Sequence, residues 1–141
     1  MKIRDSVAFV TGANRGIGLV FVQELLAGGA IVNLLSVLSW VATGTYRASK
    51  AAAWAFTNSL RTALGEQGTQ VVGVHVGLVD TDMARGLTLP KVKPADVVRQ
   101  ALSAVEAGHD EVLADDLTRQ VKAGLSDRDG IYLNFDPLHA V

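Results

Sequence analysis

The most constraining feature of the sequence is a glycine-rich turn between a short apolar run and an amphipathic segment. The apolar run at residues 7–10 is typical of a strand buried on both faces. The turn T-G-A-N-R-G-I-G follows at residues 11–18, and apolar side chains then recur at helical spacing to residue 26. Glycines there let the backbone approach a pyrophosphate, and the helix N-terminus supplies amide donors. This order indicates a dinucleotide-binding unit, with a tight turn of purely structural purpose as the alternative.

The rest of the chain alternates between buried runs and amphipathic segments. We expect strands at residues 30–35, 70–76 and 111–113, and helices at residues 46–64, 96–107 and 116–123, the last capped by Asp115. Strands that alternate with helices over 141 residues predict a single domain, residues 1–141, of the α/β class with a parallel sheet. Asn33 lies inside the second strand, where we expect its amide to bond to a neighbouring loop.

Composition excludes several classes of function. The chain has 13 Lys and Arg against 14 Asp and Glu, a formal charge of -1, so we expect no nucleic-acid partner and no anionic membrane surface. Cys is absent and the three histidines are scattered, so we expect no metal site. No apolar run reaches the roughly 20 residues that span a bilayer, and we expect a soluble cytoplasmic protein.

A second motif joins Ser36 to Tyr46-Arg-Ala-Ser-Lys50. On a helix, Tyr46 and Lys50 lie about 6 Å apart along one face. An ammonium group beside a phenol favours the phenolate, which suits the phenol to proton transfer. Taken alone, the pair is more typical of a surface Tyr and Lys on an alanine-rich helix.

The two motifs together resemble the short-chain dehydrogenase/reductase family. Its Rossmann-type members carry T-G-x-x-x-G-I-G, a serine after a later strand and Y-x-x-x-K on the following helix, in the order found here. Residues 72–83, V-G-V-H-V-G-L-V-D-T-D-M, resemble the strand, Pro-Gly and Thr that follow in the family. The resemblance implies an NAD- or NADP-dependent oxidoreductase that transfers hydride between the nicotinamide and a small-molecule carbonyl or alcohol substrate.

The resemblance also implies a role for each matching residue. Tyr46 would be the general acid/base, Lys50 would hold the nicotinamide ribose, and Ser36 would bind the substrate oxygen. The implied cofactor-binding residues are Gly12, Asn14, Arg15, Gly16, Ile17, Gly18, Tyr46, Lys50, Gly77, Val79 and Thr81. In that set the three glycines of the turn would line the pyrophosphate, and the last two residues would meet the nicotinamide carboxamide. Arg15 would favour the extra phosphate of NADP, with a solvated loop arginine as the alternative.

The sequence departs from the family in its length. The first helix joins directly to the strand at residues 30–35, so at about 30 residues for each strand and helix pair, roughly 90 internal residues are absent. The family residues that select the adenosine ribose and relay protons are lost with them. We therefore expect a shortened Rossmann-like sheet of four parallel strands in which residues 7–10 pair with residues 30–35, or a gap that another chain fills.

This shortening leaves a second function open, a catalytically impaired remnant that acts as a self-associating module. The helix that carries Tyr46 loses a neighbour, so we expect Trp54 and Phe56 to be exposed. Exposed apolar patches are usually covered by partners, which predicts a homo-oligomer. His75 is expected to be a core residue of its strand, and Asp80 and Asp82 are expected to form turns or caps.

Overall fold

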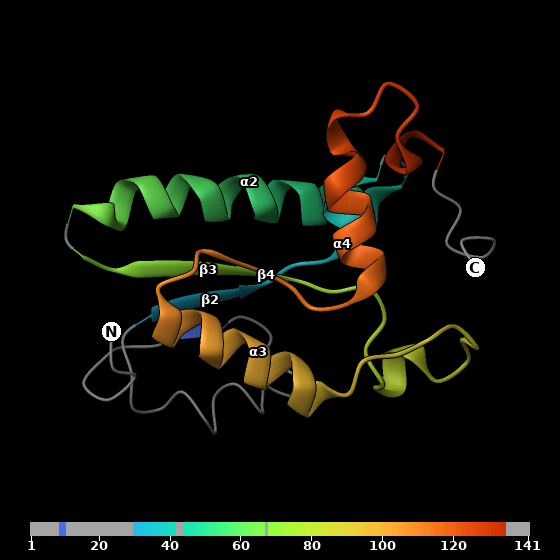
Figure 1. Ribbon diagram of the computed structural model, residues 1–141, viewed down its shortest axis with the longest axis horizontal. Coiled ribbons are helices and arrows are strands. Elements are labelled where there is room, and N and C mark those ends of the chain that lie inside the picture. The colour runs from blue at the N-terminus through green and yellow to red at the C-terminus, as the bar shows by residue number, and fades with distance from the viewer. Residues whose placement is uncertain (1–8, 11–29, 42–43, 67, 135–141) are drawn as a thin grey trace.

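The computed structural model describes residues 9–10, 30–41, 44–66 and 68–134, which form a parallel sheet with helices on both faces (Figure 1). The strands are β1 (Phe9–Val10), β2 (Ala30–Leu34), β3 (Gln70–His75) and β4 (Glu111–Leu113), adjacent in that order. The helices are α2 (Thr45–Gly65), α3 (Pro94–Ala107) and α4 (Asp116–Ala123). Short 3-10 turns are η1 (Val37–Trp40), η2 (Asp82–Ala84), η3 (Gly124–Ser126) and η4 (Ile131–Leu133). The α/β class and the shortened Rossmann-like sheet are confirmed.

Strand β1 pairs directly with β2. Phe9 lies opposite Ile31 and Val10 opposite Val32, and the pairing is parallel. The sheet is therefore continuous across the point where the family has further strands, as the first of the two sequence-based alternatives predicted. The helix expected at residues 17–26 lies outside the described residues.

Strand β3 forms the centre of the sheet because it pairs with β2 on one side and β4 on the other. Its alternating residues Val72 and Val74 face α3 on one face of the sheet, together with Val76 just beyond the strand. Helix α3 packs against these valines with apolar side chains at four-residue spacing. They are Val97, Ala101 and Val105, all at most 1% exposed. Because both faces of β3 are buried, its apolar residues form a continuous run instead of alternating with polar ones.

The opposite face of the sheet is covered by α2 and α4, as Figure 1 shows. A second core lies there, in which Trp40 of η1 packs with Trp54 of α2 and Val121 of α4. The two indole rings meet edge to face with their centroids 5.9 Å apart. The expectation that Trp54 would be left exposed was wrong, because η1 and α4 fold over it. Phe56, which points away from this core, is 62% exposed as expected.

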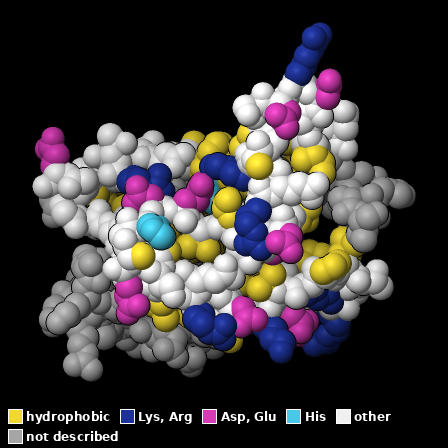
Figure 2. Space-filling model, in the orientation of Figure 1, with side chains coloured by type: hydrophobic (Ala, Val, Ile, Leu, Met, Phe, Trp, Pro, Cys, Tyr) yellow, Lys and Arg dark blue, Asp and Glu magenta, His cyan; other side chains and the backbone are white. Residues whose placement is uncertain are grey.

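The surface carries both signs of charge side by side, as Figure 2 shows on the face with α3. Arg99 lies 2.9 Å from Asp96 on α3, and Arg119 lies 2.7 Å from Asp116 on α4. Both pairs are exposed and three residues apart on a helix, so each contributes a few tenths of a kcal/mol. Within the described part of the chain, no helix is both long and apolar enough to cross a membrane.

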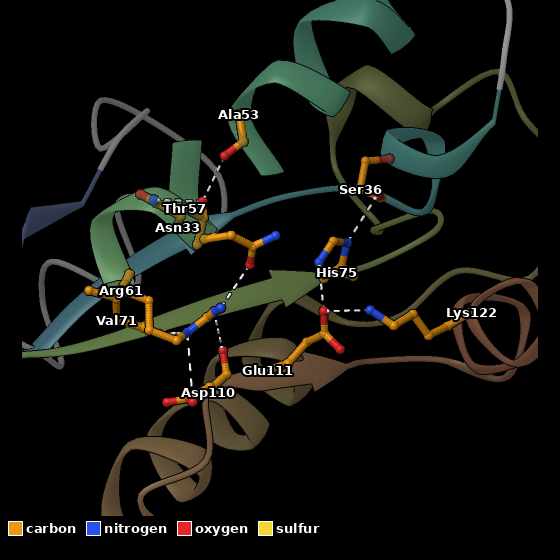
Figure 3. Close-up of polar contacts among 11 residues, drawn as sticks. Asn33, Ser36, Ala53, Thr57, Arg61, Val71, His75, Asp110, Glu111 and Lys122 are labelled. Atoms are coloured by element: carbon orange, nitrogen blue, oxygen red, sulfur yellow. Dashed lines mark hydrogen bonds and ion pairs between the residues drawn. The ribbon is translucent and has the colours of Figure 1, made fainter. Parts of the chain in front are cut away.

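A buried polar contact joins β2 to α2. The Asn33 Nδ2 donates to Thr57 Oγ1 at 2.9 Å, and the Thr57 hydroxyl donates to the carbonyl of Ala53 at 2.7 Å (Figure 3). Thr57 is fully buried. The sequence predicted a buried and bonded Asn33 amide but placed its partner on a loop, and that part was wrong. The amide instead fixes the distance between the strand and the helix above it.

Replacing Thr57 with Val should remove the acceptor while keeping the shape of the side chain. We expect the free energy of unfolding to fall by about 1 kcal/mol, because the half-buried Asn33 amide then lacks its hydrogen-bond partner. Urea unfolding of Thr57→Val measures the loss. The matched control is Ser59→Ala, which removes a hydroxyl that also bonds four residues back but is exposed. Equal effects of the two changes would contradict the role given to the buried contact.

Candidate active site

The carboxyl ends of three strands meet at one edge of the sheet and are joined by backbone hydrogen bonds. The amide of Leu35 donates to Val74 O at 2.8 Å, and the amide of Val37 donates to Val76 O at 3.0 Å. On the other side, the amide of Ala114 donates to His75 O at 2.9 Å. The segments that leave β2, β3 and β4 are thus held side by side. In open α/β sheets, ligands bind at this edge.

Tyr46 and Lys50 lie on the first turns of α2 above this edge. The Lys50 Nζ donates to the carbonyl of Leu34, the last residue of β2, at 3.2 Å. The same Nζ lies 5.9 Å from the centroid of the Tyr46 ring, as the four-residue spacing predicts. Burial lowers the pKa of Lys50. Tyr46 is 52% exposed, so its phenol is open to a ligand while the ammonium is fixed to the strand.

Ser36 follows β2 and caps η1. Its side chain is buried, and its Oγ accepts a hydrogen bond from the amide of Leu38 at 3.2 Å. A hydroxyl that accepts from an amide keeps its own proton available for donation. The structure therefore places Ser36 at the same edge as Lys50, with its oxygen held by the 3-10 turn that follows.

The segment after β3 is tied to α4 through Asp115. The amide of Gly77 donates to Asp115 Oδ2 at 2.6 Å, and the other carboxylate oxygen accepts from the amide of Thr118 at 2.7 Å. Asp115 was predicted as the cap of the last helix, and this is confirmed. Its bond to Gly77 was not predicted. A Cβ at Gly77 would lie 3.3 Å from Asp115 Oδ2, which is one reason for a glycine there.

The next residues form a short arm that is held by Val92. Val79 and Val92 form an isolated parallel bridge, with Asp80 N donating to Val92 O and Val92 N donating to Leu78 O, both at 2.9 Å. Thr81 Oγ1 donates to Val79 O at 3.3 Å. Val79 and Thr81 thus belong to one ordered segment at the carboxyl edge.

The two acidic residues of this segment, Asp80 and Asp82, lie on the surface of the loop. Asp80 and Asp82 are both exposed, and Asp82 begins η2 and forms an ion pair with Arg85. Both were expected to form turns or caps, and the position of Asp82 in the first turn of η2 agrees with this.

The glycine-rich turn is not part of the described structure. Its predicted cofactor-binding residues, Gly12, Asn14, Arg15, Gly16, Ile17 and Gly18, lie outside the described residues. The structure therefore describes the half of the site that carries Ser36, Tyr46 and Lys50. Over residues 9–10, 30–41, 44–66 and 68–134, no group of three or more His, Asp or Glu side chains is placed to hold a metal ion.

A buried ionic cluster below this edge was not predicted. His75 is fully buried, its ring stacks on Trp40 with centroids 4.2 Å apart, and its Nε2 lies 3.4 Å from Glu111 Oε1 (Figure 3). The two groups are in contact but lack the alignment of a hydrogen bond. The same carboxylate oxygen accepts from Lys122 Nζ at 3.0 Å. Sequence reasoning placed His75 in the core correctly, but no local pattern links it to Glu111 on the next strand.

The environment of Glu111 explains its ionisation. The contact with His75, together with the Lys122 ammonium, lowers the pKa of Glu111 from 4.5 to about 2, while burial acts in the opposite direction. Glu111 is therefore a carboxylate at neutral pH. Lys122 also lies over the rings of Trp40 and Trp54, 4.9 and 5.3 Å from their centroids, so the cluster joins α4 to α2 and η1.

Comparison with known proteins agrees with the motifs and the sheet. The short chain dehydrogenase family matches residues 27–91, which include Ser36, Tyr46 and Lys50. This match covers a little less than half of the chain. Uncharacterized oxidoreductases from two strains of Staphylococcus epidermidis are 36% identical over 84 residues, covering 57% of this chain and 36% of theirs. The chain thus spans about a third of the length of the curated relatives it matches.

Solved structures show the same fold. A short chain dehydrogenase from Burkholderia cenocepacia, crystallised in complex with NADP, superposes with a TM-score of 0.78 and 24% identity, covering 90% of this chain and 95% of that one. A bulky-bulky ketone specific alcohol dehydrogenase from Comamonas testosteroni superposes with a TM-score of 0.51 and 26% identity, covering 67% and 36%. The first likeness spans nearly the whole of both chains, so the shortened sheet has a counterpart among solved structures.

The ionic cluster predicts a pH-dependent stability. Because the pKa of Glu111 is lower in the folded chain than its ordinary 4.5, its contribution is complete above that value and is lost as pH falls towards 2. Glu111→Gln should therefore lower the free energy of unfolding by about 1 to 2 kcal/mol at pH 7, after allowance for the partial exposure of the carboxylate.

Urea unfolding of Glu111→Gln and the wild type between pH 2 and pH 7 measures the difference. It should shrink below pH 4.5 and disappear near pH 2. Glu106→Gln, an exposed change on α3, is the control and should stay within about 0.5 kcal/mol of the wild type throughout. A Glu111→Gln difference that does not vary with pH would contradict the ionic role.

Proposed function

We propose that the chain is an NAD(P)(H)-dependent oxidoreductase that acts on a small-molecule carbonyl or alcohol. The observation that carries the proposal is the position of Tyr46 and Lys50, with the exposed phenol beside an ammonium that is fixed to the last carbonyl of β2. Two findings support it: the matching curated relatives are oxidoreductases, and the Burkholderia cenocepacia protein was crystallised with NADP. A phenol, an ammonium and a hydroxyl at one sheet edge are the donors that a nicotinamide ribose and a carbonyl oxygen require.

The residues divide the chemistry as follows, with a bound nicotinamide supplying or accepting the hydride. Tyr46 exchanges a proton with the substrate oxygen as the general acid/base. Lys50 stabilises negative charge on the Tyr46 oxygen and, with its remaining N–H groups, binds the ribose hydroxyls. Ser36, whose Oγ is held by the Leu38 amide, donates its proton to the substrate oxygen.

The cofactor would lie along the carboxyl edge. We assign the nicotinamide end to Gly77, Val79 and Thr81 and the pyrophosphate end to the glycine-rich turn. Arg15 in that turn favours NADP over NAD. A hollow of about 490 Å³ opens between η1 and the first two turns of α2, and its lining includes Arg47 and Ser39 as well as Trp40, Val41 and two alanines.

Calorimetric titration with NADPH and, separately, NADH tests the cofactor site. Saturable binding at micromolar concentration, about -8 kcal/mol, is expected with NADPH the tighter ligand. The absence of heat up to millimolar cofactor would overturn the proposal. That result would favour instead the alternative function, a catalytically impaired module that keeps the family motifs without binding the cofactor.

Tyr46→Phe should separate chemistry from binding. We expect turnover to fall by about a hundredfold to ten-thousandfold, because the proton donor is lost, while the Kd for cofactor stays close to that of the wild type. Turnover of a panel of aldehydes and ketones, followed by NADPH absorbance, measures the first quantity and calorimetry the second. Tyr132→Phe, in η4, is the matched control and should keep full turnover. Full turnover in Tyr46→Phe would exclude the tyrosine as the acid/base.

We also propose that the chain self-associates through the outer face of α2. The support is Phe56, which is 62% exposed on a helix whose inner side already packs on the sheet. Light scattering should give a mass of at least two chains, and Phe56→Lys should reduce it to that of one chain. Leu133→Lys, at an equally exposed position in η4, is the control and should leave the mass unchanged. A monomeric wild type would refute self-association without bearing on the enzyme.

A further inference from the structure

His75 lies directly beneath the candidate serine. Its Nδ1 is 3.4 Å from the backbone carbonyl oxygen of Ser36, and its Nε2 is 3.4 Å from Glu111 Oε1. Figure 3 shows the ring between these two oxygens, reaching from β3 towards the end of β2 on one side and towards β4 on the other. The ring is fully buried, and its position is fixed by the stacked indole of Trp40.

The two oxygens that face the ring both accept hydrogen bonds. A ring nitrogen that faces a carbonyl oxygen can bond to it only as an N–H donor, so the contact with Ser36 requires the proton on Nδ1. On the other side of the ring, Glu111 is a carboxylate at neutral pH. Lys122 from α4 shares that carboxylate, and the indole of Trp40 stacks on the ring.

We propose that His75 is a positioning residue for Ser36. Its Nδ1–H holds the Ser36 carbonyl, and Glu111, anchored by Lys122, holds the ring in the orientation that makes this contact. The Ser36 carbonyl also accepts from the amide of Ser39 at 2.9 Å in η1, and the His75 contact holds it from the side of the sheet. The two contacts together fix where the Ser36 hydroxyl points. The catalytic part of this inference rests on the proposed oxidoreductase function, whereas the contact itself does not.

Two substitutions of His75 separate the two sides of the ring. Asn places an amide N–H near the position of Nδ1, so His75→Asn keeps a donor to Ser36 O, whereas Gln reaches further and keeps a donor near the position of Nε2, towards Glu111. We expect His75→Asn to retain kcat within a few-fold. His75→Gln should lose about tenfold to a hundredfold, since small misplacements of a reacting group cost that much. The KM for cofactor should be the same in both.

A readout without turnover follows the contact itself. In protein labelled with ¹³C at the serine carbonyls, the Ser36 carbonyl resonance should stay near its wild-type position in His75→Asn and move in His75→Gln. A purely structural histidine would lower stability in both variants, with equal kcat and equal carbonyl shifts, and that result would overturn the proposal. If the wild type turns over no substrate, the proposed function fails, and the carbonyl resonance alone decides the positioning role.

Glu111→Gln tests the same contact if neither His75 variant folds. Glu111 is partly exposed, and its replacement leaves the imidazole in place but weakens its anchor. We expect the Ser36 carbonyl resonance to move and kcat to fall with an unchanged KM for cofactor. An unmoved resonance together with wild-type kcat would overturn the proposal.

Discussion

The structure depends on the pairing of β3 with both of its neighbours. This strand is fully buried from Val71 onward and carries valines towards α3 on one face and His75 towards α2 and α4 on the other. Each buried valine contributes about 1.5 to 3 kcal/mol. Because the strand pairs with β2 over residues 70–74 and with β4 over residues 73–75, it sets their register and hence the level at which their carboxyl ends stop. The candidate site forms because the carboxyl ends of these three strands lie next to one another.

Polar contacts across the buried faces then fix the helices on this frame. The Asn33–Thr57 bond sets α2 on β2, the Lys50–Leu34 bond sets its first turns at the strand end, and Asp115 ties the segment after β3 to α4. Arg61 adds a fourth contact, donating to the carbonyls of Val71 and Asp110. A buried donor or acceptor is costly to leave unpaired, so these contacts limit the helices to one position more strictly than apolar packing does.

A parallel sheet can lose internal strands and stay continuous, because neighbouring strands pair at one constant spacing. Removing internal strand and helix pairs brings β1 against β2, where Val10 meets Val32 in an ordinary parallel register. The carboxyl-side strands and α2 remain together, and with them the serine, tyrosine and lysine. The shortened sheet thus keeps the strand ends and the helix that carry Ser36, Tyr46 and Lys50.

The sequence by itself determined the elements, because hydrophobic periodicity and caps are local. The expected strands 30–35, 70–76 and 111–113 and the cap at Asp115 match the structure to within a residue or two. It also determined that Tyr46 and Lys50 share a helix face, since that follows from helical geometry alone. Only the tertiary structure decided that Trp54 is covered by η1 and α4, that Asn33 bonds to Thr57, and that His75 lies between Ser36 and Glu111. The Asn33–Thr57 and His75–Ser36 contacts join residues 24 and 39 positions apart in the chain. Such partners are chosen by the register of the sheet and the placement of the helices, which no local pattern encodes.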